Sequence, residues 1–245
     1  MTIGVLGVGA LAEYLIRGAK GVDFVLSPRS AVRVARLGHP VAGSNQQLVS
    51  ACDEVLVCLP AASGLTVLWG LKFRAGQSVC SAMAGVALAD FRDAVAPASA
   101  CLAMMPGYAN AYGLGPSLLH PPDPFWAGFL GRVGPVHPID EARTYEVAQV
   151  FGAMSGASMF LMRQLAEWYQ AQGLDAGLAR RLVAETLRGN AEVLLQSEES
   201  LDLIAAGVAT PGGITEHLVG VLRDKGALVA WDAGLDAVLK RMTGR

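Results

Sequence analysis

Residues 4–15 read GVLGVGALAEYL, and the prediction of the fold class begins from this motif. An apolar run leads into Gly7 and Gly9, and a helix-like segment begins at Ala10. With Ala12 as the third small residue, the pattern is Gly-x-Gly-x-x-Ala. In this pattern the first glycine permits a tight turn and the second lets the backbone approach a pyrophosphate. We therefore predict a dinucleotide-binding strand–turn–helix unit, in which the backbone at Gly7, Gly9, Ala10 and Leu11 contacts the cofactor.

Strand-like and helix-like segments alternate through the first half of the chain. Alternation of this kind predicts βαβ units, and the continuously apolar strands predict a parallel sheet covered on both faces. The expected strands are Ile3–Val8, Phe24–Ser27, Val55–Leu59, Ser78–Met83 and Ala100–Met105, and a glycine- and proline-rich loop then leads to a strand at Ser117–His120, a helix at Phe125–Arg132 and an edge strand at Gly134–Pro138.

After Ile139 the pattern is helical to the end of the sequence. A break is expected at Ser155-Gly156, a helix over residues 159–173, and a further helix with Asp175 as its N-cap. The fold class is therefore α/β, with an N-terminal Rossmann domain over residues 1–150. An all-helical domain for dimerisation and substrate binding is expected over residues 151–245.

Composition narrows the possible partners. The chain is 53% hydrophobic and 16% charged, whereas a typical globular domain has about 25% charged residues. No uninterrupted apolar run reaches the length of about 18 residues that a membrane span needs, so we expect a homodimer or larger homo-oligomer with an apolar interface. The net charge is −2 and no basic run occurs, which argues against nucleic acid as a partner.

The remaining composition features concern location and metals. No secretory leader is apparent, because the first residues read as a strand of the fold. The four cysteines form no CxxC pair and are expected to be buried thiols in a reducing, cytoplasmic compartment. The histidines lack metal-ligand spacing, so no metal is expected.

The end of the second strand indicates which dinucleotide is bound. An NAD site would place an acidic residue there for the ribose 2′-hydroxyl, but the sequence reads LSPRS. Ser27, Arg29 and Ser30 suit a 2′-phosphate through charge-assisted hydrogen bonds. NADP(H) is therefore the expected cofactor, with NAD(H) as the alternative.

Two further strand ends are candidates for the same edge of the sheet. In CLPAAS, Leu59 and Pro60 turn the chain away at the carboxyl edge, where ligands bind. In SAMAGV, small residues that include Ala84 leave room for the nicotinamide. Either stretch could equally be an ordinary strand–helix turn.

A second glycine signal lies in the helical half, where residues 208–218 read VATPGGITEHL. Proline followed by Gly212 and Gly213 interrupts a helix, which restarts near Ile214. A helix N-terminus with bare N–H donors and the hydroxyls of Thr210 and Thr215 would bind a carboxylate. An interhelical turn with threonine capping is the alternative.

Together these segments resemble the pyrroline-5-carboxylate reductase family across essentially the whole chain. GVLGVGALAEYL, LSPRS, CLPA, SAMAGV, MPG, GAMSGASMF and VATPGGITEHLVGVL occur in the family's order, and TPGGIT is the most specific. The resemblance implies NAD(P)H-dependent reduction of 1-pyrroline-5-carboxylate to proline and a helical domain that dimerises. It also implies that the substrate carboxylate binds at Thr210–Thr215, with Thr215 as the hydrogen-bond partner of the imine nitrogen. Ser155 is expected on the substrate side, and Asn45 on the adenosine side of the cofactor.

The sequence departs from the family pattern at two places. The family's R-x-M-P-N reads Ala103 to Gly107 here, without arginine or asparagine, and S-G-P-A-Y loses its proline and tyrosine after Ser155-Gly156. These changes leave two alternatives open: reduction of a different imine on the same scaffold, or a non-catalytic NADPH-binding regulator. A β-hydroxyacid dehydrogenase is disfavoured, because the helix after the break offers Arg163 and no lysine.

Overall fold

The computed structural model describes residues 2–29 and 31–244, and the chain divides into two compact units. The first unit comprises Met1–Gly152 together with Leu239–Arg245, and the second comprises Ala153–Val238. The first unit is therefore discontinuous in sequence. Its late segment lies beside the turn that follows β4, since a Cβ on Gly85 would lie 3.6 Å from the carbonyl oxygen of Met242.

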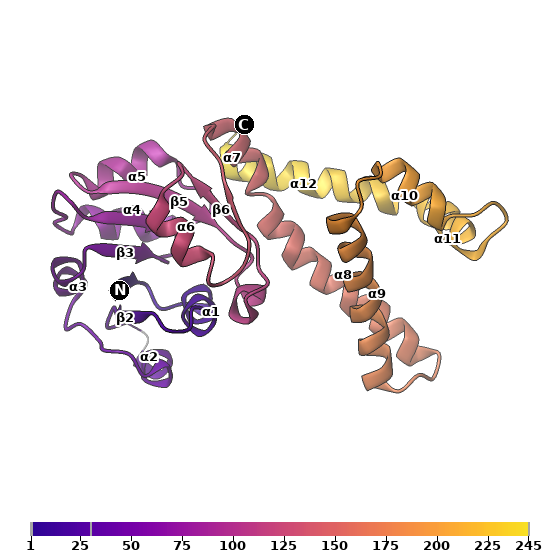
Figure 1. Ribbon diagram of the computed structural model, residues 1–245, viewed down its shortest axis with the longest axis horizontal. Coiled ribbons are helices and arrows are strands. Elements are labelled where there is room, and N and C mark those ends of the chain that lie inside the picture. Colours follow the sequence, from indigo (N-terminus) through magenta and orange to yellow (C-terminus); the bar gives the residue numbers. More distant parts are fainter. Residues whose placement is uncertain (1, 30, 245) are drawn as a thin grey trace. The chain divides into compact units, whose positions relative to one another are not determined.

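The described residues of the first unit form a seven-stranded sheet in the order β2-β1-β3-β4-β5-β6-β7 (Figure 1). Every neighbouring pair is parallel except β5 with β6. The strands are β1 (Thr2–Leu6), β2 (Asp23–Leu26), β3 (Glu54–Val57), β4 (Ser78–Ser81), β5 (Ser99–Met104), β6 (Ser117–His120) and β7 (Val136–Pro138). The predicted parallel sheet is confirmed for β1 to β5, and the chain reverses its direction of travel across the sheet between β1 and β3, which is where such sheets bind ligands.

Helices cover both faces of this sheet, as its buried side chains show. One core holds Leu15 of α1 (Ala10–Gly18), Val34 of α2 (Ala31–Leu37) and Trp126 of α6 (Pro124–Leu130). The opposite core holds residues of α3 (Asn45–Ala51), α4 (Ala61–Trp69), α5 (Leu88–Val95) and α7 (Ala142–Ala148). A 3₁₀ turn, η1 (Tyr108–Tyr112), follows β5. Because the central strands are covered on both sides, apolar residues fill most of their positions, with polar residues at the ends of β1, β3 and β4.

The second unit is helical. Its helices are α8 (Phe151–Ala171), α9 (Ala176–Gln196), α10 (Leu201–Val208), α11 (Ile214–Asp224) and α12 (Ala227–Thr243), of which α8 and α12 continue into the first unit. The predicted N-cap of α9 is confirmed, since the Asp175 carboxylate accepts a hydrogen bond of 3.0 Å from the Leu178 N–H.

The predicted helix break at Ser155-Gly156 is wrong. The helix α8 runs through both residues, and the interruption lies earlier, at Gln149 and Val150 between α7 and α8. A glycine inside a helix costs only about 1 kcal/mol, which the long run of apolar helix-forming residues around it offsets. Ser155 therefore lies within a helix and does not begin one.

Candidate functional site

The glycine turn after β1 is fixed by its neighbours. Gly7 has φ of +90°, and a Cβ there would lie 2.7 Å from the carbonyl oxygen of Cys58. The Gly7 N–H donates to Oγ of Ser27 at 2.9 Å, and the Ser27 N–H donates to the Val5 carbonyl at 3.0 Å. Only glycine fits this turn, and the turn ends β1 at Leu6, earlier than the sequence predicted.

Unlike Gly7, Gly9 has a backbone conformation that any residue can adopt, and no described neighbour would contact a Cβ there. It is the N-cap of α1 with extended backbone (φ −89°, ψ −169°), and a Cβ would meet no atom within 4 Å. No side chain caps the helix, and the helical ladder begins with the Glu13 N–H donating to the Gly9 carbonyl. The N–H groups of Ala10 and Leu11 precede that first bond, so they are orphan donors beside open space. This end of α1 fits a pyrophosphate.

The other predicted cofactor residues are distributed around the same carboxyl edge. Leu59 is half-buried after β3, Pro60 is the N-cap of α4, and Ala84 is exposed after β4. Asn45 is half-buried as the first residue of α3, whose N-cap is Ser44. The strands β1, β2, β3 and β4 all end at this edge, which follows from their parallel pairing.

The two described residues expected at the 2′-phosphate differ in exposure. Arg29 is exposed and available to an anion. Ser27 is only 2% exposed and its hydroxyl oxygen accepts from Gly7. Its observed contact braces the glycine turn. Ser30 lies outside the described residues.

The M-P-G segment after β5 has a backbone that requires its glycine. Gly107 has φ of +83° and ψ of −72°, and the Tyr108 N–H donates to the Pro106 carbonyl at 3.2 Å, which closes a γ-turn. The Gly107 N–H donates to Oδ1 of Asn110. A Cβ at Gly107 would lie 3.1 Å from the Leu11 side chain. The asparagine of the family pattern would therefore be strained here, so the departure is built into the local backbone.

The second glycine segment forms a tight turn before α11, as predicted. Gly212 has φ of +74°, Gly213 is the N-cap, and the Gly213 N–H donates to the Thr210 carbonyl at 2.9 Å. Thr210 is exposed, and Thr215 is half-buried in the first helical turn. No side chain of the N-cap caps α11.

One feature of this turn differs from the expected row of bare donors. The Gly212 N–H donates to Oε2 of Glu216 at 2.7 Å, so a carboxylate of the protein itself already takes one backbone donor of the loop. The signal was present in the sequence, because an acidic side chain in the first turn of a helix commonly pairs with free N–H groups before it.

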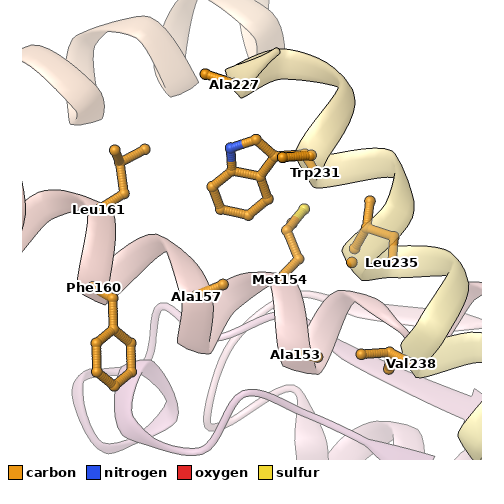
Figure 2. Close-up of a pocket in the computed structure, with 11 residues that line it drawn as sticks. Ala153, Met154, Ala157, Phe160, Leu161, Ala227, Trp231, Leu235 and Val238 are labelled. Carbon is orange, nitrogen blue, oxygen red and sulfur yellow. The ribbon is translucent and has the colours of Figure 1, made fainter. Parts of the chain in front are cut away.

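An apolar groove of about 450 Å³ lies between α8 and α12 within the second unit. In Figure 2, Trp231 projects from α12 toward Met154 and Ala157 of α8, while Phe160 points away. We call it the α8–α12 groove, and its lining consists of alanine, glycine and large apolar side chains. The described residues of this unit bury only Ala179 and Val183 among hydrophobic side chains, and they leave Phe160 72% exposed. Such a unit needs an apolar partner surface.

The described residues contain neither a cysteine with a lowered pKa nor a cluster of metal-binding side chains. All four cysteines are free; the predicted burial is confirmed for Cys52, Cys80 and Cys101, whereas Cys58 is half-buried as a residue. Burial of its thiol raises the pKa of Cys58 to about 12. Burial also raises the pKa of Cys80, which pairs in register with Cys101. These thiols stay protonated and make poor nucleophiles. Residues 2–29 and 31–244 hold no cluster of side chains able to bind a metal ion. Among the same residues, no helix has the length and hydropathy of a membrane span.

Comparison with known proteins identifies relatives along the whole chain. Residues 141–244 match the family model for pyrroline-5-carboxylate reductase dimerisation. Pyrroline-5-carboxylate reductase 1 of Bacillus spizizenii is 23% identical over 96% of this chain and 86% of its own length. The fold matches 1-pyrroline-5-carboxylate reductase of Streptococcus pyogenes (TM-score 0.89, 22% identity, 100% of this chain and 99% of the other). It also matches the NADP-bound pyrroline carboxylate reductase of Plasmodium falciparum (TM-score 0.88, 17% identity, 100% and 97%).

These matches agree with the two glycine segments and with the exposed apolar second unit. The match to a dimerisation domain supports a homo-oligomer, because almost all apolar side chains of that domain are at least partly exposed in the single chain. The comparisons therefore show a pyrroline-5-carboxylate reductase dimerisation domain over residues 141–244, and similarity along nearly the whole chain to pyrroline-5-carboxylate reductases at 23% identity or thereabouts.

Proposed function

We propose that this protein is an NADPH-dependent oxidoreductase acting on C=N bonds, which reduces a cyclic imine carboxylate, by default 1-pyrroline-5-carboxylate, to proline. The observation that carries the proposal is the N-terminus of α1 at Gly9. The N–H groups of Ala10 and Leu11 have no helical acceptor there, and a Cβ on Gly9 would have no atom within 4 Å. The similarity to pyrroline-5-carboxylate reductases supports the reaction class, and NADP in the structure of the Plasmodium protein supports the choice of cofactor.

The cofactor would supply a hydride, and residues of the first unit would hold it. Gly7 shapes the turn, and the N–H groups of Ala10 and Leu11 would bind the pyrophosphate. Arg29 would pair with the 2′-phosphate, which favours NADPH over NADH. Leu59, Pro60 and Ala84 would line the nicotinamide side of the same edge, with Asn45 near the adenosine.

The substrate would be held by the turn before α11. The Thr210 hydroxyl and the backbone of Gly212 and Gly213 would receive the carboxylate, and the Thr215 hydroxyl would hydrogen-bond the imine nitrogen. The hydride is added to the imine carbon, and the nitrogen either keeps the proton of the iminium or gains one proton, so the immediate product is a neutral secondary amine. That amine takes a further proton from water to become the cation. A substrate that enters as the iminium needs no strong acid, and alignment of the two molecules alone can contribute about 7–11 kcal/mol.

In this proposal the two domains that were predicted from the sequence have different functions. Residues 1–150 would bind the dinucleotide, and residues 151–245 would dimerise and bind the substrate, with Ser155 on the substrate side. The reaction requires that the imine held at Thr215 reach the nicotinamide held by the nucleotide-binding domain in the assembled dimer. A cytoplasmic location is in keeping with the four free thiols.

Consumption of NADPH in the presence of 1-pyrroline-5-carboxylate tests the proposal, with L-proline identified as the product. Thr215→Val should lower kcat by roughly tenfold to a hundredfold, because the hydroxyl is lost at nearly constant shape, and Thr215→Ser should recover most of the rate. The matched control is Thr186→Val, an exposed threonine on α9. Binding of NADPH without turnover of this or any other cyclic imine would refute the enzymatic proposal and favour a regulator.

A further inference from the structure

The carboxylate of Glu216 occupies the turn to which the substrate carboxylate is assigned. Its Oε2 accepts from the Gly212 N–H at 2.7 Å, in the first turn of α11. We propose that Glu216 is a specificity-determining residue, which weakens the preference of the turn for carboxylate-bearing imines over cyclic iminium substrates that lack a carboxylate. This inference rests on the proposed function of the turn.

The hydrogen bonds of the turn support this reading. The Gly213 N–H is taken by the Thr210 carbonyl at 2.9 Å, and the Gly212 N–H is taken by Glu216. Neither amide of the glycine pair is free in this conformation. A substrate carboxylate must therefore displace the Glu216 side chain, or bind without these donors.

The charge balance at this end of α11 points the same way. The N-terminus of a helix carries a partial positive charge of roughly half a unit, and one glutamate in the first turn opposes it. None of the ion pairs within the described residues includes Glu216. The basic residue of α11, Arg223, lies in its last turn. A second carboxylate next to Glu216 meets like-charge repulsion, whereas a protonated imine is attracted.

The test compares two imines, 1-pyrroline-5-carboxylate and 1-pyrroline, at saturating NADPH with the full-length protein. Glu216→Gln keeps the size of the side chain and an oxygen that can accept from Gly212, but removes the charge. The ratio of kcat/KM for the carboxylated imine to that for 1-pyrroline should rise about tenfold, mainly through a lower KM for the carboxylated imine. The matched control is Asp224→Asn at the other end of α11, which changes the net charge equally and should leave the ratio unchanged.

A ratio that changes less than about twofold in Glu216→Gln, or that changes equally in Asp224→Asn, overturns the inference. Calorimetric binding of L-proline and pyrrolidine in the presence of NADP⁺ gives a readout that needs no turnover. There Glu216→Gln should strengthen the binding of L-proline relative to pyrrolidine, and an unchanged ratio of affinities again overturns the inference. Failure of the proposed function looks different, because then neither imine is reduced by the unsubstituted protein.

Discussion

Replacing Gly9 with alanine should separate cofactor binding from folding. In the folded state an added Cβ meets no atom within 4 Å, and the backbone angles of −89° and −169° suit any residue. Alanine narrows the unfolded ensemble, which stabilises by about 0.4–1 kcal/mol, and it is a poorer N-cap than glycine by about 1 kcal/mol. These effects nearly cancel, so the free energy of unfolding should stay within about 1 kcal/mol of the unsubstituted protein.

Binding of NADPH should respond far more strongly than stability. A methyl group at Gly9 would hold the pyrophosphate away from the N–H groups at the start of α1. The loss of one hydrogen bond to a charged group is worth about 1.5–3 kcal/mol, which weakens binding roughly tenfold to a hundredfold. Calorimetry measures this affinity, and denaturant unfolding followed by tryptophan fluorescence measures the stability.

Gly7→Ala is the matched comparison for this prediction. There φ is +90° and the new Cβ would lie 2.7 Å from the Cys58 carbonyl oxygen. Backbone strain of about 1–2 kcal/mol and overpacking of about 1–3 kcal/mol should together destabilise the fold by about 2–5 kcal/mol. The reasoning fails if Gly9→Ala binds NADPH normally, or if it unfolds as readily as Gly7→Ala.

Three further predictions concern other parts of the molecule. Arg29→Ala should weaken NADPH binding about tenfold and leave NADH unchanged, whereas Arg36→Ala on α2 should affect neither; equal losses for both cofactors would contradict a 2′-phosphate contact. Trp231→Glu places a charge in the α8–α12 groove and should dissociate the oligomer in light scattering, while Trp69→Glu, at an exposed position of α4, should not. Because burial raises the pKa of Cys58 to about 12, its thiol should resist alkylation in the folded protein at about pH 8. Rapid alkylation of Cys58 in the folded protein would contradict this prediction. The stability that the neutral Cys58 thiol contributes is fully present below the unfolded pKa of about 8.5, and it should be lost as the pH rises toward about 12.

The local backbone requirements of the nucleotide-binding half could be predicted from sequence, because they are strict. The Gly7 turn follows from sterics alone, and the parallel strands follow from their continuous apolar character. The burial of Ser27 could not be predicted from the sequence. A hydroxyl at the end of a strand can bind a ligand or accept a hydrogen bond from the adjacent turn equally well. The γ-turn at Gly107 was missed because a single glycine in a loop does not specify which positive-φ turn it makes.

The helical half was harder to predict, because the energies that decide it are small. Ser155-Gly156 suggested a break, but a helix absorbs one glycine when its neighbours are good helix formers. The turn at Gly212 and Gly213 was predicted, since proline with two glycines leaves few alternatives. The contact from Glu216 was not, because a side chain in the first helical turn can face solvent, a backbone amide or a substrate with similar energy.

The discontinuity of the first unit has a consequence for biosynthesis. Leu239–Arg245 belongs with the strands and helices of Met1–Gly152, although the ribosome makes the whole of Ala153–Val238 in between. Translation proceeds at about 5–20 residues per second, so several seconds pass between synthesis of the β-sheet and synthesis of Leu239–Arg245. During this time the turn at Gly85 lacks its neighbour Met242. During translation this sheet is therefore an incomplete body, and a stalled or prematurely terminated chain would expose to chaperones and proteases a surface that the finished protein covers.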